Sequence, residues 1–213
     1  MRVIAIGLLL MTVVGVRSAR ADCGTEATAL RAHLLEERSR AYTWNSAWAI
    51  VYGSLAMIQF GLIAAKTNPF GDFDQDFKES SYVGGTKAGI GFLVRVIRPL
   101  ELHVPAQHAE PCADVKALRA AVATAGRRER ATFWLSIFGG TALNLAGSAL
   151  LWSRRDFSTA AVSFATGVPA GPIASFTQPR GSWRLWSKHR AEWAAGLDPT
   201  PRDGWMLWVA TAF

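Results

Sequence analysis

Residues 41–65 read AYTWNSAWAIVYGSLAMIQFGLIAA and contain no charged side chain over 25 positions. A helix needs about 20 mostly apolar residues to cross the hydrocarbon core of a bilayer. Two further uncharged runs, residues 131–153 and 157–179, have 23 residues each. Core helices of soluble proteins usually keep a polar face, which these runs lack. The sequence therefore predicts an integral membrane protein built from helices.

The overall composition agrees with this prediction. The chain has 213 residues, of which 50% are hydrophobic, and its mean hydropathy is +0.15. The average is modest because the charged residues gather in clusters between the uncharged runs. These clusters also produce the formal net charge of +7, which bears on solubility and binding rather than on the fold.

The N-terminus has the parts of a secretory signal peptide, which we place at residues 1–21. A basic start precedes 14 apolar residues at positions 3–16, and Ala19 and Ala21 form an A-x-A cleavage site. Asp22 stands where a lipoprotein signal needs a small residue, so lipid attachment is not expected. The alternative is an uncleaved signal anchor. In both cases the chain that follows starts on the exported side of the membrane.

The chain also contains a weak internal repeat. Cys23 precedes the letters ALRA at residues 29–32, and Cys112 precedes the same letters at residues 117–120. A charged cluster and then an uncharged run follow each copy. An even number of cysteines in an exported chain predicts a disulfide, here between Cys23 and Cys112. The alternative is two unpaired thiols, because a bond requires both cysteines on the same side of the membrane.

We therefore expect an all-α integral membrane protein, a four-helix transmembrane bundle from two weak two-helix repeats. The first repeat covers residues 22–106 and the second covers residues 107–179. In each, a polar helix runs into a span, and a short turn leads to a second apolar helix. The expected spans are residues 43–65, 81–104, 132–153 and 157–178. Residues 180–213 then form a basic aromatic tail at the membrane surface.

The two polar helices are expected to be amphipathic. Leu30 and Leu34 share one helical face, as do Val115, Leu118 and Val122. This spacing follows the period of about 3.6 residues that marks the buried face of a helix. We therefore expect these side chains to form the apolar faces of the two helices.

The expected span at residues 81–104 is the least regular. Its apolar residues form one stripe, whereas Lys87, Arg95 and Arg98 lie on the other side. Such a helix can span if its basic face turns toward other helices, or it can lie flat at the membrane surface. A flat helix leaves three spans, fits the positive-inside rule better and separates the two cysteines. We favour four spans, because the repeat and the cysteine pair both require them.

Lys87, Arg95 and Arg98 are the candidate binding residues. A charge inside a membrane span is costly unless it is paired or wetted, so it marks a functional site by default. Arg95 and Arg98 are one helical turn apart and can together bind a phosphate or a lipid head group. The structural alternative is that these side chains reach the membrane surface, or that Arg98 pairs with Glu101.

Other groups of chemical interest fit no known pattern. Residues 101–112 hold two histidines, two glutamates and a cysteine, but their spacing matches no metal site. Asp72, Asp74 and Asp76 resemble the start of a calcium loop, yet its glycine and closing glutamate are absent. We therefore expect no metal and no cofactor. The tail rich in Trp and Arg follows an apolar run, which favours a membrane anchor over a nucleic-acid surface.

No catalytic motif is present, so an enzyme is not expected. The expected function is that of a non-catalytic scaffold or partner-binding component, surrounded by lipid and packed against other membrane proteins or a second copy. The alternative is a small transporter or channel subunit, or an anionic-lipid-binding protein, that uses the basic face described above. A lipid-modifying enzyme is less favoured, because no acid–base pair supports it. The Ala- and Arg-rich composition suggests a bacterial inner membrane, with the mature N-terminus in the periplasm.

Overall fold

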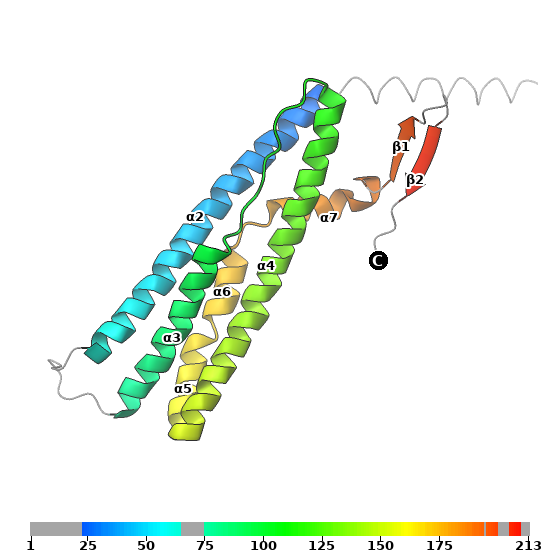
Figure 1. The fold of residues 1–213 in the computed structure, drawn as a ribbon. Coiled ribbons are helices and arrows are strands. Elements are labelled where there is room, and N and C mark those ends of the chain that lie inside the picture. Colours follow the sequence, from blue (N-terminus) through cyan, green and yellow to red (C-terminus); the bar gives the residue numbers. More distant parts are fainter. Residues whose placement is uncertain (1–22, 65–74, 194, 200–204, 210–213) are drawn as a thin grey trace, which may run out of the picture. The chain divides into compact units, whose positions relative to one another are not determined.

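The computed structural model describes residues 23–193, except for 65–74, together with the strands at 195–199 and 205–209. The predicted signal peptide lies outside these residues, as do Asp72 and Asp74. The described chain is mostly helical, with a non-helical segment at 98–110 and a short antiparallel hairpin near its C-terminus (Figure 1), which confirms the predicted helical fold. The elements are α2 (Cys23–Ala64), α3 (Gln75–Ile97), α4 (Pro111–Arg154), α5 (Phe157–Gly167), α6 (Ala170–Thr177), α7 (Gly181–Trp193), β1 (Ala195–Pro199) and β2 (Trp205–Val209).

The chain divides into two compact units. The first, here called the disulfide unit, comprises Met1–Glu37, Leu102–Gly126 and Gly181–Phe213. The second, here called the bundle unit, comprises Arg38–Glu101 and Arg127–Arg180. Each of the long helices α2 and α4 contributes its first turns to the disulfide unit and its remainder to the bundle unit.

Helices α2 and α4 are continuous over 42 and 44 residues. At about 1.5 Å per residue, each is roughly twice as long as the hydrocarbon core of a bilayer is thick. Both are long and apolar enough to cross a membrane, judged by length and composition alone. The prediction that each polar helix runs directly into an apolar one is therefore confirmed.

The bundle unit has an unusual distribution of side chains. Its buried positions include small and polar residues such as Asn144, Ser163 and Ala174. Its exposed positions include large apolar side chains such as Met57 (77% exposed) and Phe138 (64% exposed). A water-soluble bundle places its large apolar residues inside, whereas membrane helices pack through small and polar residues. The bundle unit follows the second pattern.

Glycines bring the helices of the bundle unit close together. A Cβ at Gly84 of α3 would overlap the amide group of Gln59 in α2. A Cβ at Gly171 of α6 would lie 2.7 Å from the carbonyl oxygen of Ser136 in α4. That neighbour is backbone and cannot rotate away, so the approach of α4 and α6 depends on the missing side chain.

Helix α3 ends at Ile97, earlier than the expected limit of residue 104. Pro99 explains this end, because proline cannot donate a backbone hydrogen bond and disfavours a helical residue before it. The chain after α3 is held by Asn45 of α2. Its side-chain amide donates to the Leu100 carbonyl at 3.1 Å, and its side-chain oxygen accepts from the Leu100 N–H at 3.1 Å.

The segment expected as the fourth span, residues 157–178, is not one continuous helix but two, α5 and α6. Asp156 begins α5 by accepting from the backbone N–H of Thr159 at 2.8 Å. The interruption falls at Val168 and Pro169, where proline cannot donate the next helical hydrogen bond. Asn144 of α4 donates to the Gly167 carbonyl at this interruption, at 3.1 Å.

The disulfide unit has a conventional apolar core. Its amphipathic helices bury the apolar faces predicted from the sequence, and Leu34, Leu118 and Val122 are fully buried. Glu37 accepts the backbone N–H of Gly181 at 2.9 Å and thereby fixes the start of α7. The region expected at the membrane surface thus contains α7 and the hairpin, in which β1 and β2 pair antiparallel.

Candidate anion-binding cavity

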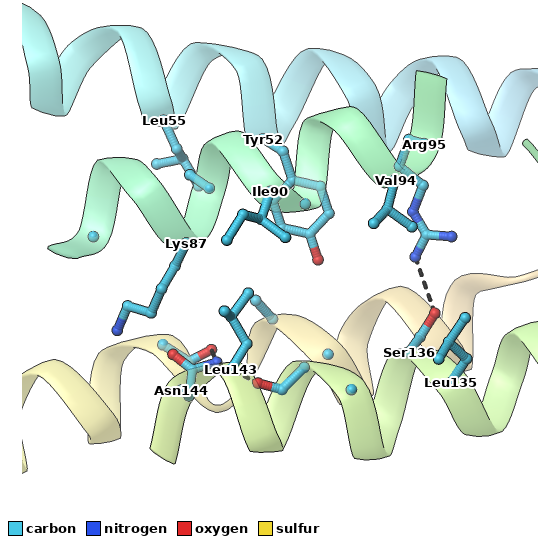
Figure 2. A pocket seen from close by; sticks show the side chains of 18 of the residues that line it. Tyr52, Leu55, Lys87, Ile90, Val94, Arg95, Leu135, Ser136, Leu143 and Asn144 are labelled. Atoms are coloured by element: carbon cyan, nitrogen blue, oxygen red, sulfur yellow. Dashed lines mark hydrogen bonds between the residues drawn. The ribbon is translucent and has the colours of Figure 1, made fainter. Parts of the chain in front are cut away.

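The bundle unit contains a half-open cavity of about 1300 Å³ lined by α2, α3, α4, α5 and α6. Its wall is mostly apolar, with residues such as Leu55, Ile90 and Leu135, and carries a smaller number of polar and basic side chains. Figure 2 shows Lys87 extending from α3 toward α5 and Arg95 extending toward Ser136 of α4, with the ring of Tyr52 between them. The three basic residues singled out in the sequence, Lys87, Arg95 and Arg98, all line this one cavity.

Arg95 is buried, with 7% of its surface exposed. Its guanidinium carbon lies 4.1 Å from the centre of the Trp44 ring, a cation–π contact. One terminal nitrogen donates to the hydroxyl of Ser136 at 3.0 Å. A guanidinium has five N–H donors in a flat fork, which suits the two oxygens of a carboxylate or phosphate. Ser136 occupies only part of this capacity.

Lys87 lies two turns before Arg95 on α3 and is half-buried. Its ammonium donates to the Ser163 hydroxyl at 3.1 Å and approaches the Ser163 carbonyl at 3.5 Å. The interruption between α5 and α6 is adjacent, since a Cβ at Gly167 would lie 3.3 Å from the Lys87 nitrogen. Lys87 is therefore surrounded by neutral hydrogen-bonding groups.

Neither cation has a carboxylate within ion-pair distance in the described part of the chain. The expected alternative, a pair between Arg98 and Glu101, is also absent among these residues. The Arg98 side chain is exposed, whereas the Arg95 side chain is buried. The burial of Arg95 without a counter-charge is the exceptional feature of the site.

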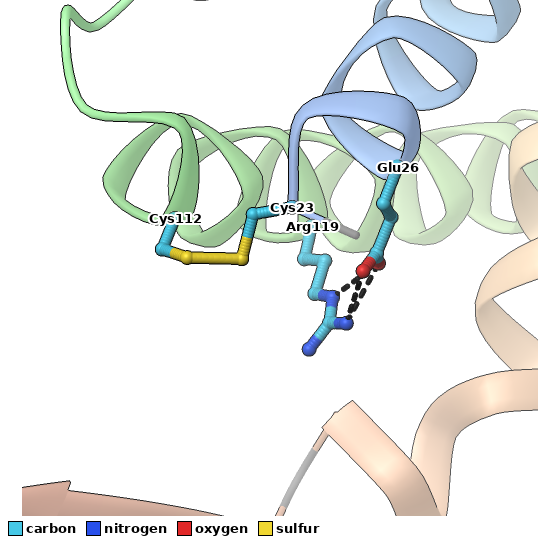
Figure 3. The surroundings of a disulfide bond; sticks show 4 residues. All are labelled: Cys23, Glu26, Cys112 and Arg119. Carbon is cyan, nitrogen blue, oxygen red and sulfur yellow. Dashed lines mark hydrogen bonds and ion pairs between the residues drawn. A yellow bond between two sulfur atoms is a disulfide. The ribbon is translucent and has the colours of Figure 1, made fainter. Parts of the chain in front are cut away.

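The charges of the disulfide unit are arranged differently. Figure 3 shows the predicted disulfide between Cys23 and Cys112, which the structure confirms, beside the ion pair of Glu26 with Arg119. Both oxygens of Glu26 accept from Arg119, each at 2.7 Å. Glu26 and Arg119 thus each have a partner of opposite charge.

A second ion pair mirrors the first. Arg31 donates to both oxygens of Asp114, at 2.8 and 3.1 Å. Asp114 is 88 positions after Glu26 and Arg119 is 88 positions after Arg31, so the two pairs exchange acid and base between α2 and α4. This reciprocity agrees with the internal repeat expected from the sequence.

Asp114 is stabilised in its charged form. The backbone N–H of His108 donates to it at 3.0 Å, and this bond is the main reason that its pKa lies below the usual range. The Arg31 guanidinium adds to the effect. Among the described residues no group of three metal-binding side chains occurs, and His108 acts here through its backbone.

Sequence reasoning missed the neutral partners of the two cations. These partners, Ser136 and Ser163, are polar residues inside the uncharged runs. Their position in otherwise apolar segments was the available signal, because polar residues within a span tend to face other helices.

Comparisons with protein families, with characterised proteins and with solved structures found no match. The function is therefore argued from the chain's own residues.

Proposed function

We propose that this protein crosses a membrane four times and binds an oxyanion in the bundle cavity. The large apolar side chains exposed on the bundle unit support membrane residence, because water would leave them unfavourably solvated. We further propose that the membrane is the inner membrane of a bacterium and that the mature N-terminus is on the periplasmic side.

The disulfide supports four spans rather than three. Cys23 and Cys112 stand at the starts of α2 and α4, and their bond requires both starts on the same side of the membrane. Helix α3 must then return across the bilayer between them. Its 23 residues are long enough for this crossing. The three-span alternative puts the cysteines on opposite sides and does not permit the bond.

The observation that carries the binding proposal is the pair of cations at Lys87 and Arg95 without a carboxylate partner. A cation inside a membrane protein is costly unless an opposite charge or water compensates it. An oxyanion between the helices supplies that charge and occupies the free donors of Arg95. The ligand is a phosphate or carboxylate group, and it comes either from a free anion or from a lipid head group.

Thermal unfolding of the purified protein in uncharged detergent tests this proposal. We expect inorganic phosphate, or a short-chain phosphatidic acid, to raise the melting temperature in a concentration-dependent way. Arg95→Met should abolish the rise and Lys87→Met should weaken it. Stabilisation by phosphate identifies a free anion, whereas stabilisation by the phospholipid alone identifies a head group.

Arg130→Met is the matched control, because Arg130 is an exposed arginine of the bundle unit that does not line the cavity. It should keep the full response to the ligand. A wild-type protein whose melting temperature responds to neither ligand would contradict the proposal. The scaffold function expected from the sequence then becomes the better interpretation of the exposed apolar surface.

A further inference from the structure

The cavity extends along most of α3. Its lining residues on this helix begin at Ser80 and end at Arg98. These 18 steps correspond to about 27 Å at roughly 1.5 Å per residue. The hydrocarbon core of a bilayer is about 30 Å thick. The cavity is thus nearly as long as the distance that a solute must travel to cross the membrane.

Hydrogen-bonding groups occur along the whole length of this lining. Ser80 lies near the start of α3, Lys87 with Ser163 lies further along, and Arg95 with Ser136 lies near its end. Lys87 and Arg95 are separated by about 12 Å along the helix axis. The ring of Tyr52 lines the cavity between them (Figure 2). A polar solute therefore meets hydrogen-bonding partners at intervals along the wall.

The charges along the lining have one sign except at one end. Lys87, Arg95, Arg98 and Arg128 line the cavity, and Glu101 is the single acidic residue among the lining residues. Glu101 lies beside Arg128, which donates to its backbone carbonyl at 3.1 Å. Pores lined by arginine and lysine favour anions and repel cations. Two separated cations also suit transport, since an ion must bind well enough to enter and weakly enough to leave.

We infer that the cavity is a pathway along which small oxyanions cross the membrane, with Arg95 and Lys87 as successive binding positions. This inference rests on the proposed anion binding and adds movement to it. Arg98 and Arg128 attract the anion at one end of α3, Arg95 receives it, and Lys87 with Ser163 holds it midway. A lipid bound permanently in the same cavity would block this movement.

Phosphate and acetate uptake into proteoliposomes tests the inference, since these probes represent the two oxyanion classes. Valinomycin and potassium prevent a membrane potential from stopping the flux. We expect uptake of at least one anion above the rate of protein-free vesicles. Lys87→Met should reduce that uptake at least tenfold while leaving the phosphate-induced stabilisation through Arg95 detectable, and Lys87→Arg should restore a substantial part of it.

A steric variant gives an independent readout. Thr166 lines the cavity near Lys87 and carries no charge, so Thr166→Phe should obstruct the path and stop uptake without removing a cation. Arg130→Met should transport at the wild-type rate. Circular dichroism and size-exclusion chromatography confirm that each variant is folded.

The possible results separate this inference from the proposed function. Phosphate or acetate that stabilises the wild-type protein without being taken up overturns the pathway and leaves the binding proposal intact. Stabilisation by the anionic phospholipid alone also overturns the pathway and assigns the cavity to a lipid. Absence of both stabilisation and uptake rejects the binding proposal and the pathway together. Uptake that persists in Lys87→Met rejects the role of Lys87.

Discussion

The disulfide unit and the bundle unit share the two long helices, but the charges of the first unit and the cavity charges of the second have opposite surroundings. Elsewhere in the bundle unit, Arg155 pairs with Glu79, as the charges of the disulfide unit do. In the disulfide unit, Arg31 and Arg119 each meet a carboxylate and the core is apolar. In the bundle unit, Lys87 and Arg95 meet only neutral groups and the large apolar side chains are exposed. The difference teaches that the charges of the first unit neutralise one another, whereas the cavity cations have no carboxylate partner among the described residues, and the proposed anion binding rests on this.

The largest effect is expected from removing the disulfide. The bond closes a loop across 89 positions, for which the chain-entropy relation gives about 4 to 5 kcal/mol as an upper value. Cys23→Ser with Cys112→Ser should destabilise the disulfide unit by several kcal/mol, measured as loss of hydrogen-exchange protection in the first turns of α2 and α4. The cavity cations should still bind phosphate. Loss of binding in this variant would show that the two units do not function separately.

The sharpest test of the comparison uses one substitution in each unit. Without ligand, Lys87→Met should raise the free energy of unfolding by about 1 to 2 kcal/mol, because it removes an uncompensated cation. Arg31→Met should lower it, because Asp114 then loses its counter-charge and keeps only the backbone N–H of His108. Chemical unfolding in detergent measures both changes. If both substitutions change the free energy of unfolding in the same direction, the distinction between charges that stabilise the fold and charges that await a ligand is wrong.

A third prediction concerns packing in the bundle unit. Gly171→Ala should destabilise the protein by about 1 to 3 kcal/mol, because its methyl group must displace the Ser136 backbone. Gly139→Ala is the control, since a Cβ there has its nearest neighbour, a Leu135 methyl, at 3.6 Å. The control should stabilise α4 by up to about 1 kcal/mol through helix propensity. Equal melting temperatures for the two variants would contradict the close approach of α4 and α6.

The fourth prediction is a pH dependence of the disulfide unit. The pKa of Asp114 is lower in the folded protein than in the unfolded chain, where it is about 3.9. The stabilisation from its charged form is therefore fully present above about pH 5 and is lost as the pH falls through the lowered pKa. Hydrogen exchange at the start of α4 should accelerate below pH 4, and Asp114→Asn should remove this dependence. An unchanged acid response in Asp114→Asn would assign it to another group.

The smallest effect is expected from exchanging the partners of the more exposed ion pair. Glu26→Arg with Arg119→Glu keeps the pair but reverses its direction, and these side chains are 34% and 39% exposed. Exposed pairs contribute about 0 to 1 kcal/mol, so the melting temperature should change little. Each single substitution places two like charges together, so each single variant should be less stable than the double variant. A large loss in the double variant would indicate a further role for one of these residues.

The sequence predicted those features that depend on one local pattern. The length of the uncharged runs identified the long helices. The helical spacing of apolar residues identified the faces that contain the buried Leu34 and Leu118, and the even number of cysteines identified the disulfide. The candidate cations were also found, because charge is conspicuous in apolar segments. What the sequence did not provide is their common cavity, since that depends on which faces of several helices meet.

The interruption between α5 and α6 shows a different limit. Pro169 and Pro172 are visible in the sequence, but a helix in a membrane can continue past proline with only a bend. The helix is interrupted where Asn144, on another helix, supplies a donor to the Gly167 carbonyl. The outcome is thus set by a contact between segments distant in the chain. The two hydrogen bonds between the Asn45 side chain and the Leu100 backbone could not be predicted from the sequence for the same reason.

The disulfide also has a consequence for biogenesis. Cys112 is synthesised only after α2 and α3 are complete. In the proposed four-span topology, Cys112 can meet Cys23 only when both of these helices have been inserted into the membrane. In that topology the oxidised bond reports the correct insertion of the first helical hairpin. A chain whose α3 failed to insert would keep two free thiols on opposite faces of the membrane, where quality-control machinery and thiol reagents could distinguish it from the finished protein.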